Sequence, residues 1–247
     1  MSATTRHPLG SRVAALLGAG ALAFLGACTT PSAPPASSLS APSATTTTNA
    51  PAPSAAEILE KARANAVGAK SAAFTGQIDQ DGTEMVIDFK GTSDGASADV
   101  TLQIEAQGKV RVISVADEVY LQGDAQFWKS QGLPSPPAAD KFVKAPVAAA
   151  ELTQQLSLNA FLDEAFNAVT PSQLSDTVGS ESVGGVDAWV ITDAEGQAEG
   201  ALYVSKSEFE IVRFTGSSTS PGQLDFSKWN EDLGIKPPSA DQVAPLG

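Results

Sequence analysis

Short segments in which apolar and polar residues alternate constrain the fold of this chain more than any other feature. The alternation occurs in the segments 74–78, 84–90, 99–105 and 110–115. The pairs Asp81-Gly82 and Asp94-Gly95 separate the first three segments and are typical of tight turns. Because a period of two gives each strand one apolar and one solvated side, the sequence predicts an antiparallel meander.

Helical patterns come before and after this meander. Ser54 and Glu57 have the spacing of a capping box, and the helix that follows places Ile58, Leu59, Ala62, Ala66 and Val67 along one side. Two further helical patterns run from Val147 to Leu156 and from Leu158 to Val169. Strand patterns then resume at 186–192, 200–205, 210–215 and 223–229. This order predicts an α+β fold, with one twisted antiparallel sheet and helices on its concave side.

The N-terminus has the features of an export signal. Arg6, His7 and Arg12 precede an apolar run at 13–25, which is too short to be a comfortable membrane span. The run ends in Leu25-Gly26-Ala27-Cys28, which resembles the bacterial lipobox. That resemblance implies that residues 1–27 are a lipoprotein signal peptide and that Cys28 is lipidated and becomes the mature N-terminus. Two alternatives for this segment are an ordinary signal peptide followed by a chance cysteine and an uncleaved membrane anchor.

A polar segment follows the lipobox. Residues 28–53 contain no charged and no aromatic side chain and consist mainly of Pro, Ser, Thr and Ala. Such a composition cannot bury enough apolar surface to offset its ordering entropy, so we expect a disordered tether. The prediction is therefore a folded domain at 54–247, held on the extracytoplasmic side of the cell membrane by the acyl anchor on Cys28.

Residue counts exclude several kinds of chemistry. The chain has one His and one Cys, which are His7 and Cys28. After signal cleavage and lipidation, no Ser-His or Cys-His nucleophile and no His/Cys zinc site remains. We therefore expect a protein that is not an enzyme and has no metal or cofactor. A formal net charge of −13 also argues against nucleic acid as a partner.

Taken together, these features resemble the actinobacterial LppX/LprG-type lipoproteins, whose domain is similar to LolA and LolB. The resemblance rests on the lipobox, the tether, the Ala-rich first helix, and the segments 118–128, 141–144 and 224–229. It implies a strongly curved antiparallel half-barrel that wraps helices on its concave face. It also implies an apolar cavity that binds the acyl chains of a lipid or glycolipid, in a carrier or chaperone for lipid transport.

Inward-facing positions would line such a cavity. They are Phe74, Met85, Ile87, Phe89, Val100, Leu102, Ile104, Val112, Phe161, Phe166, Ile191 and Val204. The same residues also suit a filled core. The alternative function is therefore a non-catalytic, tethered interaction module that binds another envelope protein and no lipid. In that case the middle helices and Trp128, Trp189 and Trp229 would fill the interior.

Overall fold

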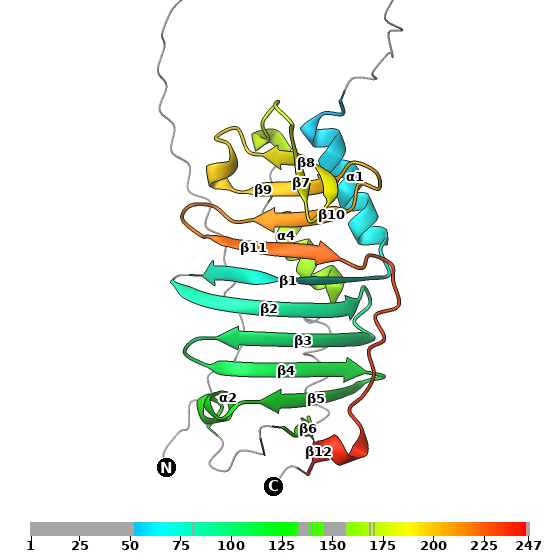
Figure 1. Ribbon diagram of the computed structural model, residues 1–247, viewed down its shortest axis with the longest axis vertical. Coiled ribbons are helices and arrows are strands. Elements are labelled where there is room, and N and C mark those ends of the chain that lie inside the picture. Colours follow the sequence, from blue (N-terminus) through cyan, green and yellow to red (C-terminus); the bar gives the residue numbers. More distant parts are fainter. Residues whose placement is uncertain are drawn as a thin grey trace, which may run out of the picture. The chain divides into compact units, whose positions relative to one another are not determined.

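The described residues fold around one large open sheet (Figure 1). The computed structural model describes residues 52–80, 82–132, 138, 140–145, 157–167, 169 and 171–245. Their twelve strands lie in the order β12-β6-β5-β4-β3-β2-β1-β11-β10-β9-β8-β7. The pairing is antiparallel except between β12 and β6, which are parallel. Strands β12 and β7 are the two edges of the sheet.

The first half of the sheet is the predicted meander. Its strands are β1 (Ser71–Gln80), β2 (Thr83–Thr92), β3 (Ser97–Ile104), β4 (Gly108–Val115) and β5 (Glu118–Gly123). The short strand β6 (Phe142–Lys144) extends it beyond β5. Each neighbouring pair is antiparallel, as tight turns between consecutive strands require.

The second half of the sheet comes from the C-terminal part of the chain. Its strands are β7 (Gly179–Val183), β8 (Val186–Thr192), β9 (Ala201–Ser205), β10 (Ile211–Thr215) and β11 (Gly222–Ser227). One short 3-10 helix, η2 (Pro171–Gln173), precedes it, and a second, η3 (Gln197–Glu199), interrupts it. Strand β11 pairs with β10 on one side and with β1 on the other, so it joins the two halves.

Helix α1 (Ala55–Gly68) begins as the sequence predicts. The Ser54 hydroxyl accepts a bond from the Glu57 amide, and the Glu57 carboxylate accepts one from the Ser54 amide, which completes the capping box. Ile58, Leu59 and the alanines of the predicted stripe are buried, but Val67 is 57% exposed. The assignment of Val67 to the buried side was wrong, because one residue beyond Ala66 turns the side chain about 100° around the helix.

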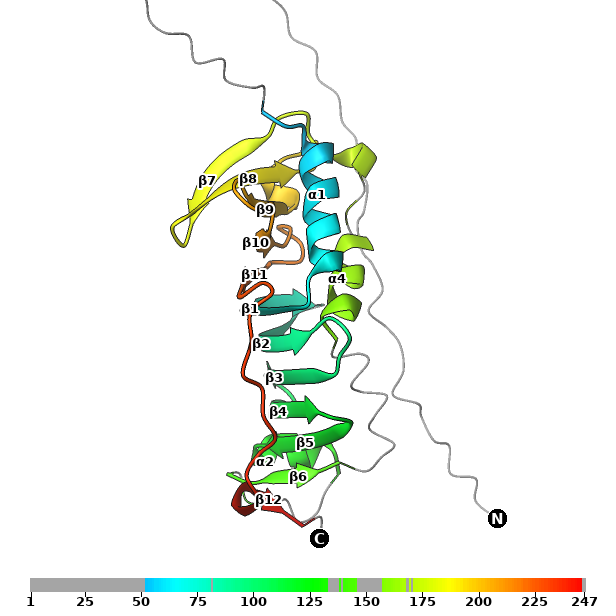
Figure 2. The ribbon, with the colours of Figure 1, turned by 90° about the vertical axis from the view of Figure 1, so that its right-hand side faces the viewer.

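Helix α4 (Leu158–Asn167) packs on the same side of the sheet as α1 (Figure 2). Leu158, Leu162 and Phe166 lie in one buried cluster with the stripe of α1 and with apolar residues of β1–β3 and β8–β11. This arrangement confirms the prediction of helices gathered on one face of an antiparallel sheet. The helical pattern predicted for 147–156 lies outside the described residues.

The sequence did not predict helix α2 (Ala125–Ser130). Asp124 caps it by accepting a 2.7 Å bond from the Phe127 amide. Trp128 is buried beside β5, where its indole N–H donates to the Gly123 carbonyl over 3.0 Å. Trp128 therefore belongs to the packing of α2 against β4 and β5.

Residues 228–245 form a C-terminal strap that runs from β11 along the sheet to its far edge (Figure 2). The strap ends in the 3-10 helix η4 (Ala240–Gln242) and strand β12 (Val243–Ala244). Ile235 and Val243 pack against a cluster of Ile113, Tyr120 and Phe142. These three side chains alternate with those on the helix side, so the strap covers the opposite face. No helix among the described residues is both long and apolar enough to cross a membrane.

Candidate functional site

Strand register brings most of the predicted lining residues onto one surface. Three rows of directly opposed residues cross β1–β4 on the helix side. The first is Phe74, Phe89, Val100 and Val112, the second is Gly76, Ile87, Leu102 and Val110, and the third is Ile78, Met85, Ile104 and Gly108. We call this surface the inner face. Its composition is a direct result of the alternation in the sequence, since opposed residues share a side of the sheet.

Aromatic rings fill the space over the first row. The ring of Phe74 lies 4.6 Å from that of Phe89 and 4.2 Å from that of Phe161 on α4, both in stacked geometry. Phe226 of β11 lies 5.1 Å away on the neighbouring strand. Phe74 is only 1% exposed. At this position the interior is therefore a packed core, and the three predicted lining residues in the stack are part of it.

The second and third rows are more accessible. Ile87 and Leu102 are half-buried and pack against the edge of the core cluster. Met85 and Ile104 are also half-buried, and they lie one row further from the aromatic stack. We call these four residues the apolar strip. Side chains of this size that remain partly accessible side by side provide a surface that can accept an apolar ligand.

The remaining predicted lining residues are buried elsewhere. Val100, Phe166, Ile191 and Val204 belong to the core cluster that includes α1 and α4, and each is at most 2% exposed. Val112 is 8% exposed. Trp189 and Trp229 pack partly buried against the same cluster, as the alternative function expected, whereas Trp128 does not. The predicted set thus divides between a filled core and the apolar strip.

The opposite face of the meander carries charged side chains. Arg111 and Asp99, on neighbouring strands, form two hydrogen bonds of 2.8 Å each. This bonding to Asp99 raises the pKa of the Arg111 guanidinium, and burial only partly opposes it. On β10 and β11, the Nε of Arg213 donates one hydrogen bond to the Asp225 carboxylate. The two faces of the sheet therefore differ in polarity, and an apolar ligand would bind the inner one.

A metal site of the usual ligand types is not found in the described part of the chain. Within it, no group of three or more His, Cys, Asp and Glu residues is placed to hold a metal ion. Cys28, the predicted lipidation site, lies outside the described residues.

Comparison with known proteins gives structural matches only. No family model and no curated protein matches the chain. Among solved structures, the lipoprotein LppX of Mycobacterium tuberculosis is 13% identical, with 74% of this chain and 98% of that chain covered and a TM-score of 0.45. LprF of Mycobacterium bovis is 12% identical, with 75% and 97% covered and a TM-score of 0.49.

A third similar structure is the MucA/MucB complex of Pseudomonas aeruginosa, at 17% identity, 77% and 60% coverage and a TM-score of 0.30. LppX-type lipoproteins, which the sequence resembles, are thus among the structures found. At these identities the likeness concerns the fold alone, and the function has to be inferred from the residues of this chain.

Proposed function

We propose that the protein is a membrane-anchored lipoprotein that binds the acyl chains of a lipid or glycolipid on its inner face, as a carrier or chaperone in lipid transport. The observation that carries this proposal is the apolar strip. Its four large apolar side chains face the same side as the helices yet remain partly accessible. A group of apolar side chains that stays partly accessible is a common feature of ligand-binding surfaces.

Hydrocarbon chains fit this surface for a simple energetic reason. Each methylene that leaves water contributes about 0.8 kcal/mol, so affinity grows with the length of chain laid against the strip. The four side chains of the strip lie on the neighbouring strands β2 and β3, which are about 4.8 Å apart. Because the contacts that the strip offers are apolar, we expect the affinity for a lipid to depend on its hydrocarbon chain more than on its headgroup.

The adjacent residues Met85 and Val86 test this proposal. Met85 points to the inner face, whereas Val86 is 39% exposed and points to the other side. We expect Met85→Asp to lose bound lipid, because a carboxylate in the strip has to be desolvated by the ligand. Val86→Asp should retain the lipid. The measurement is native mass spectrometry of each Cys28→Ser protein, purified from its own host under non-denaturing conditions.

Equal loss of lipid in the two variants would contradict the proposal that the lipid binds on the inner face. Circular dichroism and thermal melting of both variants provide the folding control. Met85 lies outside the buried core cluster, so a charge there should cost little stability compared with one in the core.

Anchoring has a separate test. Replacing Cys28 by Ala should abolish incorporation of labelled palmitate. Stable attachment needs two or more acyl chains, because a single chain binds only marginally. Processing that is unchanged by globomycin, which inhibits the lipoprotein signal peptidase, would show that residues 1–27 act as another kind of signal.

The aromatic stack favours one alternative, a tethered module that binds an envelope protein and carries no lipid. Phe74, Phe89, Phe161 and Phe226 occupy the space in which a deep cavity would otherwise lie. A clean apo mass for the Cys28→Ser protein from its own host would support this function over lipid binding.

A further inference from the structure

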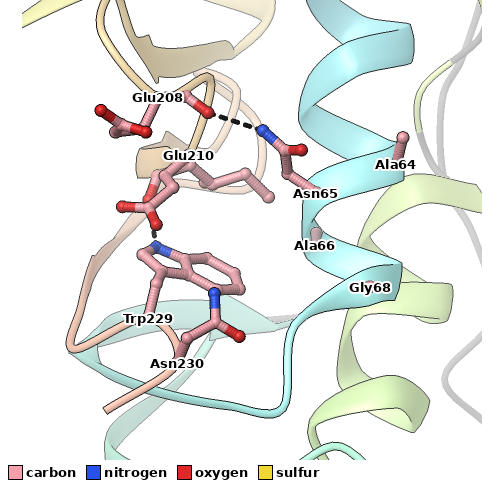
Figure 3. A pocket seen from close by; sticks show the side chains of 9 residues that line it. Ala64, Asn65, Ala66, Gly68, Glu208, Glu210, Trp229 and Asn230 are labelled. Atoms are coloured by element: carbon pink, nitrogen blue, oxygen red, sulfur yellow. Dashed lines mark hydrogen bonds between the residues drawn. The ribbon is translucent and has the colours of Figure 1, made fainter.

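A separate cavity of about 310 Å³ lies between α1 and the C-terminal part of the chain (Figure 3). Its lining residues come from the second half of α1, from the turn before β10 and from the start of the strap. They are Ala64, Asn65, Ala66, Gly68, Glu208, Glu210, Ile211, Trp229 and Asn230. None of them belongs to the apolar strip, so a ligand of this cavity would bind independently of the proposed lipid.

Hydrogen bonds fix the walls of this cavity. The Asn65 side-chain amide donates to the carbonyls of Glu208 and Phe209, over 2.6 and 3.3 Å. The Trp229 indole N–H donates to the Ile211 carbonyl over 2.9 Å. Because these bonds tie α1 to the turn and the strap to β10, the positions of the indole and of the turn are set before any ligand arrives.

Unusual backbone conformations shape both sides of the cavity. The described part of the chain has five non-glycine residues with positive φ, and three of them border this site. Phe209, at φ 55°, separates Glu208 from Glu210, while Lys228 at 56° and Asn230 at 59° flank Trp229. For a bulky residue such as Phe, this conformation is a genuine outlier that the surrounding structure has to hold in place.

Glu208 and Glu210 are both among the lining residues and give this region a negative charge. Among the described residues, neither Glu208 nor Glu210 takes part in an ion pair. Burial raises the pKa of Glu210, and the negative charges of Glu208 and Glu231 raise it further. Lys61 lies four residues before Asn65 on α1, and its ammonium group makes a cation–π contact with the Phe209 ring, 4.5 Å from the ring centre.

We propose that this cavity binds a small organic cation, an ammonium group with alkyl substituents. Its lining residues include one tryptophan, two glutamates and two asparagines, which come from three separate parts of the fold. Aromatic rings attract ammonium groups through their quadrupole, and carboxylates supply the opposite charge. The volume of about 310 Å³ is sufficient for a group of the size of choline.

The first experiment titrates choline into the full-length Cys28→Ser protein and follows the indole N–H signals by ¹H–¹⁵N NMR. The chain has three tryptophans, and Trp229→Phe assigns the signal of interest. We expect a saturable shift of the Trp229 signal. The uncharged isostere 3,3-dimethylbutan-1-ol should cause none. No saturable shift with choline, or an equal shift with the isostere, would overturn the proposal.

The second experiment uses charge variants. Glu210→Gln preserves the size of the side chain and removes its charge, so it should raise the dissociation constant for choline about tenfold. Glu195→Gln is the matched control, since Glu195 is an exposed glutamate outside the cavity, and it should leave binding unchanged. An equal effect of both substitutions would mean that overall charge attracts choline, and the cavity assignment would fail.

Glycerophosphocholine distinguishes two sources of the same ammonium group. Tighter binding of choline would identify a free amine as the ligand, and tighter binding of glycerophosphocholine would identify a lipid headgroup. Absence of binding by both compounds would overturn the proposal.

Discussion

Replacing Gly76 by alanine is expected to cost about 3 kcal/mol of unfolding free energy or to prevent folding altogether. An added Cβ would lie 1.8 Å from the backbone carbonyl oxygen of Gln223, and no change of side-chain rotamer can relieve this clash. Gly76 lies opposite Leu224 where β1 pairs with β11, so the clash falls on the junction of the two halves of the sheet. Urea unfolding, followed by circular dichroism, measures the effect.

Gly68→Ala is the matched control for this substitution. A Cβ on Gly68, at the end of α1, would meet nothing within 4 Å. Alanine is a better helix former than glycine by about 1 kcal/mol, so this variant should be as stable as the parent or slightly more so. If Gly76→Ala proved equally harmless, the register between β1 and β11 would be wrong.

The second large effect is expected for Phe74→Ala, which should lower the free energy of unfolding by about 3–5 kcal/mol. The Phe74 ring contacts rings from β2, β11 and α4, and its removal leaves a void that the surrounding backbone cannot fill. Val67→Ala removes an aliphatic side chain from the exposed side of α1 and should change stability by no more than about 0.5 kcal/mol.

Differential scanning calorimetry distinguishes a packed core from a ligand site at Phe74. If this ring lined an open cavity, its truncation would change stability little and ligand binding strongly. A loss of stability within the expected range, without added lipid, identifies the aromatic stack as structural.

Local patterns explain why much of the fold could be predicted from the sequence. Alternation and turn residues define the strands β1–β4, and the capping box of Ser54 and Glu57 defines the start of α1. These signals act between residues close in sequence. The position of Val67 was the exception, because an apolar residue at the margin of a helical stripe can fall on either side.

Non-local pairing could not be predicted in the same way. Nothing in the composition of 223–229 specifies that this segment pairs with β1. The strap has few apolar residues, and of these Ile235 and Val243 pack against the cluster of Ile113, Tyr120 and Phe142. Helix α2 was missed although Asp124 is a good N-cap residue, because six residues are too few to show a helical period.

The same distinction applies to the candidate sites. The apolar strip results from alternation in neighbouring strands. Which inner-face positions are covered by aromatic rings depends on where Phe161 and Phe226 lie, and only the tertiary structure determines that. The cavity beside α1 brings together Asn65, Glu208 and Trp229, which are distant in sequence and share no motif. No pattern in the chain could have indicated it.

The central place of β1 has a consequence for how the chain matures. A chain that emerges N-terminus first delivers β1 early and β11 late, so Ala73 of β1 has no pairing partner until Ser227 of β11 has emerged. Until then one edge of β1 has unpaired amide and carbonyl groups, which can associate with other unfinished chains. We therefore expect the yield of native protein, more than its final stability, to depend on a holdase that protects this edge while the chain emerges.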